Sequence, residues 1–185
     1  MTTEENTADR FRRLAATLTQ RVDSVPQDRW DDASPCDGWS ARDVLRHVVD
    51  SQADFVTKVD LEIPPGPSVD DDPSAAWQHT RDAMQAILDD PAKANRSYDS
   101  SFGSSTLAKT VDSFFCFDLV VHGWDIAHAT GIDESIAPKD LDFLKSFADG
   151  MGDMMRTSGS FGPAVDVPVD ADQQTKVLAY LGRTM

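Results

Sequence analysis

The feature that most constrains the fold is the helical spacing of apolar residues along nearly the whole chain. Phe11, Leu14, Leu18 and Val22 recur at intervals of three and four, so they share one face of a helix expected from about Thr3 to Val25. The same periodicity predicts further helices over about 40–59, 74–89, 104–131, 138–155 and 170–182. Strand signals are almost absent. The pattern therefore predicts an all-α fold, an antiparallel four-helix bundle with a short C-terminal appendage.

Helix-breaking residues separate these segments. Pro26 and Pro91 end helices, Gly131 is a suitable residue just past a helix end, and the Pro-rich stretch 63–73 is an inter-helix loop. Residues 92–103 are expected to be irregular, although 95–102 could hold a short extended piece, and residues 161–169 are expected to be extended. Residues 1–185 then form one domain, with a bundle over about 3–157 and an extension over about 158–185.

The charge balance excludes several classes of partner. Lys and Arg total 17 against 32 Asp and Glu, a formal net charge of −15, and no basic residues cluster on one face. Nucleic acids and anionic membrane surfaces are therefore not expected partners. The N-terminus has no apolar core typical of a signal peptide, and no apolar run is long enough to span a bilayer. We expect a cytoplasmic protein with reduced cysteines.

Three polar residues interrupt the apolar face of the expected helix 104–131. With Leu107 at zero on a helical wheel, Asp118 falls at about 20°, His122 at about 60° and Asp125 at about 0°, while Phe114 lies inward at about −20°. Burying a carboxylate without a partner is costly. Asp118 and His122, at i and i+4, point to one spot and could both bind a metal ion. The alternative is a buried, metal-free Asp–His hydrogen bond.

A third ligand has to come from another helix. His47, on the expected second helix, lies off the centre of its apolar stripe, which suits a site open to solvent on one side. His79 has polar neighbours, and His128 points about 120° away from His122. Asp125 is expected to support the site through a hydrogen bond, to a loop N–H or an indole N–H, and not as a ligand.

The two cysteines have different expected roles. Cys36 precedes the N-terminus of the second helix and could be a nucleophile, although a small apolar side chain packed in the loop is the favoured interpretation. Cys116 falls on the side of its helix opposite the candidate ligands, which indicates packing or an interface.

Two motifs resemble a known family. The segment SPCDGWSARDVLRHVV (34–49), followed by FDLVVHGWDIAHATG (117–131), is similar to DinB/YfiT-like metal-binding bundles. It resembles more closely the actinobacterial-type relatives of mycothiol-dependent maleylpyruvate isomerase, as does the closing segment 167–183. The resemblance implies a divalent metal, zinc most often or nickel, held by His47, Asp118 and His122.

The chain departs from that isomerase in two ways. The isomerase uses Glu where this chain has Asp118, which is one methylene shorter, and it carries a sizeable second domain where this chain has a short appendage. Maleylpyruvate is therefore not the expected substrate.

The ligand set and the resemblance together predict the chemistry. Three protein ligands leave a coordination position open, which could take a low-molecular-weight, mycothiol-like thiol and favour its thiolate form. The implied reaction is thiol transfer to a small electrophile, or a thiol-assisted isomerisation. A metal-dependent hydrolase, a metal-binding stress or regulatory module without turnover, and a purely structural Asp–His pair remain alternatives. The all-round apolar residues 114–127 also predict a homodimer.

Overall fold

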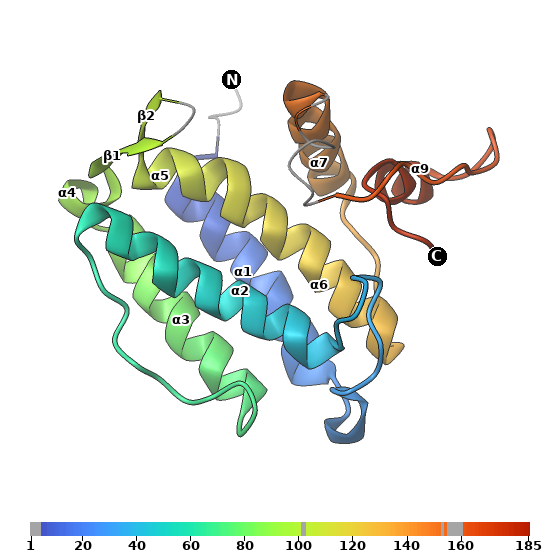
Figure 1. Cartoon of the computed structure of the whole chain (residues 1–185), viewed down its shortest axis with the longest axis horizontal. Coiled ribbons are helices and arrows are strands. Elements are labelled where there is room, and N and C mark those ends of the chain that lie inside the picture. The colour runs from blue at the N-terminus through green and yellow to red at the C-terminus, as the bar shows by residue number, and fades with distance from the viewer. Residues whose placement is uncertain (1–4, 101–102, 153, 155–160) are drawn as a thin grey trace.

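The computed structural model describes residues 5–100, 103–152, 154 and 161–185. Most of this part of the chain is helical, as expected for the all-α class. Its elements, labelled as in Figure 1, are α1 (Thr7–Ser24), η1 (Gln27–Arg29), α2 (Ala41–Val56), η2 (Thr57–Val59), α3 (Pro73–Leu88), α4 (Pro91–Ala94), β1 (Ser97–Ser100), β2 (Gly103–Thr106), α5 (Leu107–Thr110), η3 (Val111–Phe115), α6 (Cys116–Thr130), α7 (Pro138–Met151) and α9 (Gln173–Tyr180).

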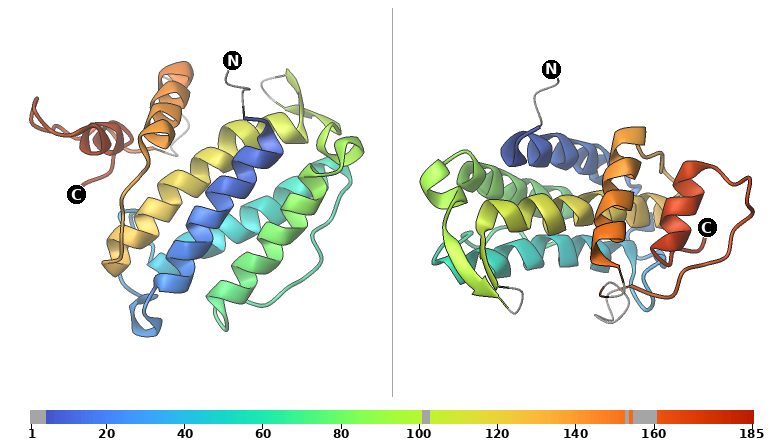
Figure 2. Two further views of the ribbon diagram at one scale, coloured as in Figure 1. Left: turned by 180° about the vertical axis from the view of Figure 1, so that it is seen from behind. Right: turned by 90° about the horizontal axis from the view of Figure 1, so that it is seen from above.

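Four long helices, α1, α2, α3 and α6, lie side by side and enclose the main core (Figures 1 and 2). α1 and α2 each contact both α3 and α6. Fully buried side chains from all four helices meet between them, among them Phe11, Leu18, Leu45, Trp77, Met84, Phe117 and Leu119. Burial of this apolar surface is the main stabilising contribution to the fold.

The direction of the helices follows from contacts at their ends. Arg12 at the start of α1 pairs with Asp89 just past the end of α3, and Ser74 at the start of α3 donates to Asp23 near the end of α1. α1 and α3 are therefore antiparallel. α2 and α3 run in the same direction, because residues 60–72 return along the length of α3 before it begins (Figure 1). The expected antiparallel order thus does not apply to these two consecutive helices.

Local capping explains where several helices begin. The Asn6 side chain accepts from the Asp9 N–H at the start of α1, and Ser40 and Asp43 form a reciprocal capping box at the start of α2. α3 begins with Pro73 after its cap, Asp72. These starts match the expected helices within a few residues.

The helix expected over 104–131 differs from its prediction at its N-terminal end. Residues 103–106 pair instead with 97–100 in a short antiparallel ladder, and the helix begins at Leu107. Its second turn, η3, is a π-turn. A π-turn accommodates one extra residue and rotates the preceding segment by about 100° relative to a continuous α-helix. Phe114, expected to face inward, is consequently 43% exposed.

The C-terminal helices lie beside α1 and α6, on the side of the long helices away from α3 (Figures 1 and 2). α7 contacts α6, and α9 contacts α7. The last helix follows its cap, Asp172, and so begins a few residues later than the expected range of 170–182. Residues 161–169 are irregular, without a strand. The expected boundary between bundle and extension, near residue 157, lies outside the described residues.

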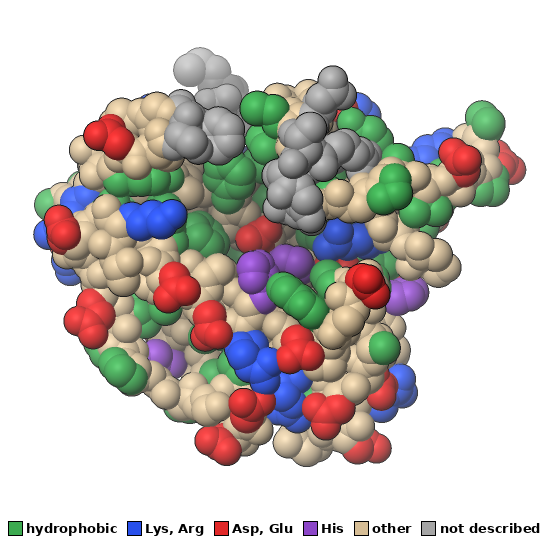
Figure 3. All heavy atoms as spheres, in the orientation of Figure 1, with side chains coloured by type: hydrophobic (Ala, Val, Ile, Leu, Met, Phe, Trp, Pro, Cys, Tyr) green, Lys and Arg blue, Asp and Glu red, His purple; other side chains and the backbone are tan. Residues whose placement is uncertain are grey.

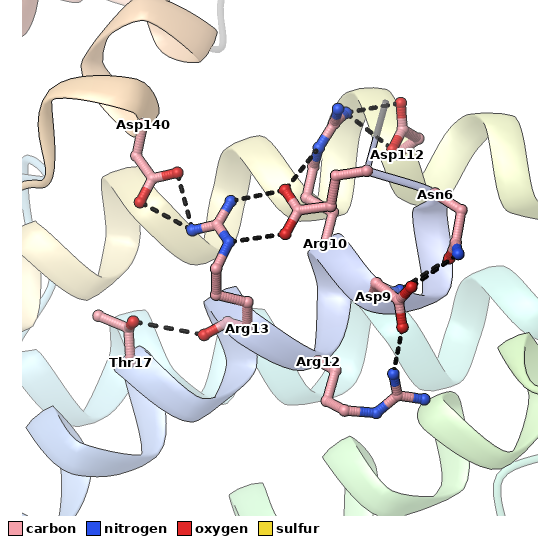
Figure 4. Close-up of polar contacts among 9 residues, drawn as sticks. Asn6, Asp9, Arg10, Arg12, Arg13, Thr17, Asp112 and Asp140 are labelled. Atoms are coloured by element: carbon pink, nitrogen blue, oxygen red, sulfur yellow. Dashed lines mark hydrogen bonds and ion pairs between the residues drawn. The ribbon is translucent and has the colours of Figure 1, made fainter. Parts of the chain in front are cut away.

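Ion pairs attach α1 to its neighbours (Figure 4). Arg10 binds both oxygens of Asp112, and Arg13 binds both Glu5 and Asp140, the last of these on α7. The Arg13–Asp140 pair is largely shielded from solvent, so it fixes α7 against α1 more firmly than an exposed pair would.

None of the helices that the structure describes is both long and apolar enough to cross a bilayer.

Candidate metal centre

Two helices bring the three candidate ligands together. His47 comes from the middle of α2, and Asp118 and His122 come from successive turns of α6. One potential ligand atom from each residue lies within 4.8 Å of the other two. The rings of His47 and His122 meet edge to face with centroids 5.1 Å apart. Figure 3 shows histidine side chains gathered at the surface in the middle of one face.

Asp118 lies in this group without a protein partner. It forms no hydrogen bond or ion pair with any residue that the structure describes. Burial raises the pKa of Asp118 above its ordinary value, and the neighbouring His122 only partly offsets this effect. A partly enclosed carboxylate that lacks a partner and faces two imidazoles favours a bound cation.

The ring of His122 is held by the carboxylate of Asp125. Its Nδ1 lies 3.0 Å from Oδ2 of Asp125, so Nε2 is the nitrogen left for a ligand. Burial alone lowers the pKa of His122, but its hydrogen bonds with Asp125 and Cys36 and the charges of Asp118 and Asp125 outweigh burial and raise it. A carboxylate behind a ligand imidazole is the usual partner in histidine metal sites.

His47 borders a solvent-open groove. The groove has a volume of about 510 Å³ and is lined by Gly38, Trp39, Asp43, Arg46, His47, Asp50, Ser51 and Asp54. The ring of Trp39 lies 5.2 Å from that of His47. Burial, followed by the charge of His122, lowers the pKa of His47 and favours the neutral imidazole that binds metals. His47 is half-buried, as its off-centre position on the helix suggested.

Asp125 has partners that the sequence did not indicate. The side chain is fully buried, and its contacts are the ring of His122, the thiol of Cys36 at 3.3 Å and the guanidinium of Arg183 at 2.8 and 3.0 Å. The expected bonds to a loop N–H or an indole N–H are not among them. Trp124 Nε1, the neighbouring indole nitrogen, is buried without a partner among the described residues.

A second group, Cys36, His122 and Asp125, also brings potential ligand atoms within 4.8 Å of one another. It shares His122 with the first group. Two hydrogen bonds from Arg183 occupy the Asp125 carboxylate. A cation there would have to displace a buried arginine, so the group with Asp118 is the better candidate.

The remaining histidines and Cys116 lie elsewhere. His79 Nε2 contacts the Pro64 carbonyl at 2.7 Å. His128 stacks on Trp124, and its Nδ1 lies 2.7 Å from Glu134. Cys116 is fully buried, and burial raises the pKa of its thiol to about 12, which fits the predicted packing role.

Arg183 is the residue of this site that sequence reasoning missed. The only signal in the sequence is a basic residue directly after the glycine that ends the last helix, which is too weak to assign a contact 58 residues away.

The described part of the chain is thus a helical fold in which two helices bring two imidazoles and a carboxylate together. Residues 11–127 match the family described as the mycothiol maleylpyruvate isomerase N-terminal domain, which falls within the DinB/YfiT-like superfamily. The chain belongs to this family. The match includes all three residues, ends within the last turn of α6, and stops before α7, α9 and Arg183. No curated protein and no solved structure gives a significant match.

Proposed function

We propose that the protein binds a divalent metal through His47, Asp118 and His122 and acts as an enzyme of the mycothiol S-transferase or isomerase type. The observation that carries this proposal is the Asp118 carboxylate, which has no partner among the described residues and faces two imidazoles from two helices. Family membership supports a metal-binding, mycothiol-related role.

The donor set fits zinc first and nickel second. Ligand bonds of about 2.0–2.2 Å place neighbouring ligands of a tetrahedral ion roughly 3.4 Å apart, which is compatible with donor atoms that already lie within 4.8 Å of one another. Two nitrogens and one oxygen do not by themselves select a single metal. Three protein ligands are also typical of a catalytic site, because a structural zinc site is normally closed by four.

The residues around the three ligands suit a polar thiol substrate. When bound, a divalent metal with an open position would favour the thiolate form of an incoming thiol, which is its nucleophilic form. Asp125 would hold the Nδ1–H of His122 and keep the ring oriented. Asp50, Ser51 and Trp39 line the groove beside His47 and would contact the body of a mycothiol-like molecule. The electrophile would be a small molecule.

Metal analysis tests the site. Purified protein should contain about one equivalent of metal, and the single variants His47→Ala, Asp118→Ala and His122→Ala should each lose it. His79→Ala is the matched control and should retain the metal. A full equivalent of metal in all three ligand variants would overturn the proposed site.

Turnover separates the remaining alternatives. Thiol-dependent consumption of a panel of small electrophiles would support the transferase or isomerase. Metal-dependent hydrolysis of ester or amide substrates without thiol would favour the hydrolase instead. If the protein binds metal but no substrate is consumed in either assay, the metal-binding module without turnover is the better assignment.

The proposal also includes the helix packing and the oligomeric state. We assign the packing of α1, α2, α3 and α6 to the four-helix bundle of the superfamily. The homodimer stays a prediction: most of the apolar surface over 114–127 is buried within the chain, and exposed Phe114, which packs on Phe147, is what could meet a second copy. Sedimentation at micromolar concentration tests it, and a monomer would contradict it.

A further inference from the structure

The guanidinium of Arg183 reaches the candidate metal centre from the C-terminal end of the chain. Its Nε donates to Oδ1 of Asp125 at 3.0 Å and its second terminal nitrogen donates to Oδ2 at 2.8 Å, a two-pronged ion pair. Both partners are buried, with Asp125 at 0% and Arg183 at 8% exposure. A paired geometry of this kind fixes the plane of a carboxylate as well as its charge.

The end of α9 directs Arg183 toward this site. The Gly182 N–H donates to the Ala179 carbonyl and the Arg183 N–H donates to the Leu178 carbonyl, the pair of bonds of a Schellman motif. Gly182 has a φ of +82°, which reverses the chain after the helix. Arg183, the residue directly after this reversal, is therefore directed back toward the protein interior.

The same carboxylate holds His122. Oδ2 of Asp125 lies 3.0 Å from Nδ1 of His122 and also accepts from the Cys36 thiol at 3.3 Å. Without Arg183, the fully buried carboxylate would lack its cationic partner and could turn toward another donor. With Arg183 in place both of its oxygens are fixed, and Oδ2 stays on the imidazole.

We propose that Arg183 is a positioning residue for the metal centre. It acts through Asp125 to orient His122, so the segment that follows the matched family region forms part of the site. The inference rests on the proposed function in taking His122 as a metal ligand. It does not depend on which metal binds or on whether turnover follows.

Zinc affinity, measured by competition with a chromogenic chelator, provides the first test. Arg183→Met should weaken zinc binding about 10- to 100-fold, the usual effect of removing a group that supports a ligand. Arg183→Lys keeps the positive charge but cannot form the paired hydrogen bonds of a guanidinium. Its zinc affinity should lie between that of Arg183→Met and that of the wild type. Arg13→Met is the matched control, because Arg13 also donates to both oxygens of a largely buried carboxylate. That carboxylate belongs to Asp140 and lies away from the site. Arg13→Met should bind zinc as the wild type does.

A double-mutant cycle tests the route through Asp125. In an Asp125→Asn background, Arg183→Met should change zinc affinity by less than about twofold, since the group through which it acts is already altered. An unchanged affinity in the single variant Arg183→Met would overturn the proposal, and so would equal losses in the Arg183 and Arg13 variants.

A readout without metal separates failure of this proposal from failure of the proposed function. In metal-free protein the Nδ1–H of His122 should give a slowly exchanging proton NMR resonance, present in wild type and Arg13→Met and lost or broadened in Arg183→Met. If wild-type protein binds no zinc, the proposed function fails, and this resonance decides the role of Arg183. A resonance that survives in Arg183→Met shows that Arg183 does not position His122.

Discussion

At the scale of single residues, Asp118 and His122 make the metal-free site sensitive to pH. The pKa of each is raised in the folded protein, that of His122 to about 10, so the folded state binds protons more tightly than the unfolded state does. Stability contributed by a group with a raised pKa is present at low pH and is lost as the pH rises toward its folded pKa. The lowered pKa of His47 acts in the opposite direction, below its ordinary value of 6.5.

We therefore expect the free energy of unfolding of the metal-free protein to fall between pH 7 and pH 9. The slope would be at most about 1.4 kcal/mol per pH unit for one proton. Urea denaturation in the presence of a chelator measures it. His122→Gln should flatten the slope, whereas His128→Gln, whose ring contacts Glu134 away from the site, should retain it. A wild-type stability that rises over this range would contradict the prediction.

Two glycines should respond to alanine with opposite signs. At Gly182, with φ at +82°, an added Cβ would lie 3.1 Å from the backbone oxygen of Gly162, so Gly182→Ala should destabilise the fold by about 1–2 kcal/mol. At Gly150, within α7, a Cβ would meet nothing within 4 Å, so Gly150→Ala should stabilise by about 0.5–1 kcal/mol. Chemical denaturation measures both, and effects of the same sign would show that backbone conformation is not the cause.

Among the helices, the π-turn over 111–115 lets the two halves of one long helix pack against different neighbours. α5, before the turn, packs beside the short ladder of β1 and β2, and α6, after it, carries Asp118 and His122. The extra residue of the turn leaves Phe114 partly exposed, packed on Phe147, while Val111 and Phe115 remain buried.

Removal of the extra residue should be tolerated. Deletion of Phe114 converts the π-turn to a regular α-helical turn and leaves the faces on both sides nearly in place, so we expect a folded protein that still binds zinc. Deletion of Val120, between Asp118 and His122, is the comparison: it changes their spacing from i, i+4 to i, i+3 and rotates the rest of α6 by about 100°. We expect that variant to lose zinc binding. Circular dichroism measures the folding of both deletion variants, and a zinc competition assay measures their zinc affinity. Equal zinc affinities in the two variants would contradict this account.

At the scale of the whole molecule, a metal at the proposed site would connect α2 to α6. These helices contact each other in the core, and the ligand groups meet beside that contact. A ligand that binds only the folded state adds stability according to its concentration relative to its dissociation constant.

Zinc at about 1,000 times its dissociation constant should add about 4 kcal/mol. For a protein of this size that corresponds to a rise in Tm of roughly 8–16 °C. Differential scanning fluorimetry with and without zinc measures the rise. Asp118→Ala should abolish it, and Asp112→Ala, whose carboxylate pairs with Arg10, should retain it. A Tm that zinc leaves unchanged in the wild type would contradict the proposed site.

Features that depend on neighbouring residues could be predicted from the amino-acid sequence. Helix spacing and caps such as Ser40 depend on bonds within one turn, so the helices were predicted to within a few residues. For the same reason the i, i+4 pair Asp118 and His122 could be placed on one face. The π-turn was missed, because its extra residue follows from packing on both sides of the helix and no residue type marks it.

Contacts between distant groups could not be predicted in this way, because they depend on how the helices pack. How near His47 comes to Asp118 depends on how α2 packs against α6, and the shared direction of α2 and α3 depends on the path of residues 60–72. The Arg183–Asp125 pair joins groups 58 residues apart. Such contacts arise from the packing of whole helices, whose relative positions no local hydrogen-bond pattern encodes.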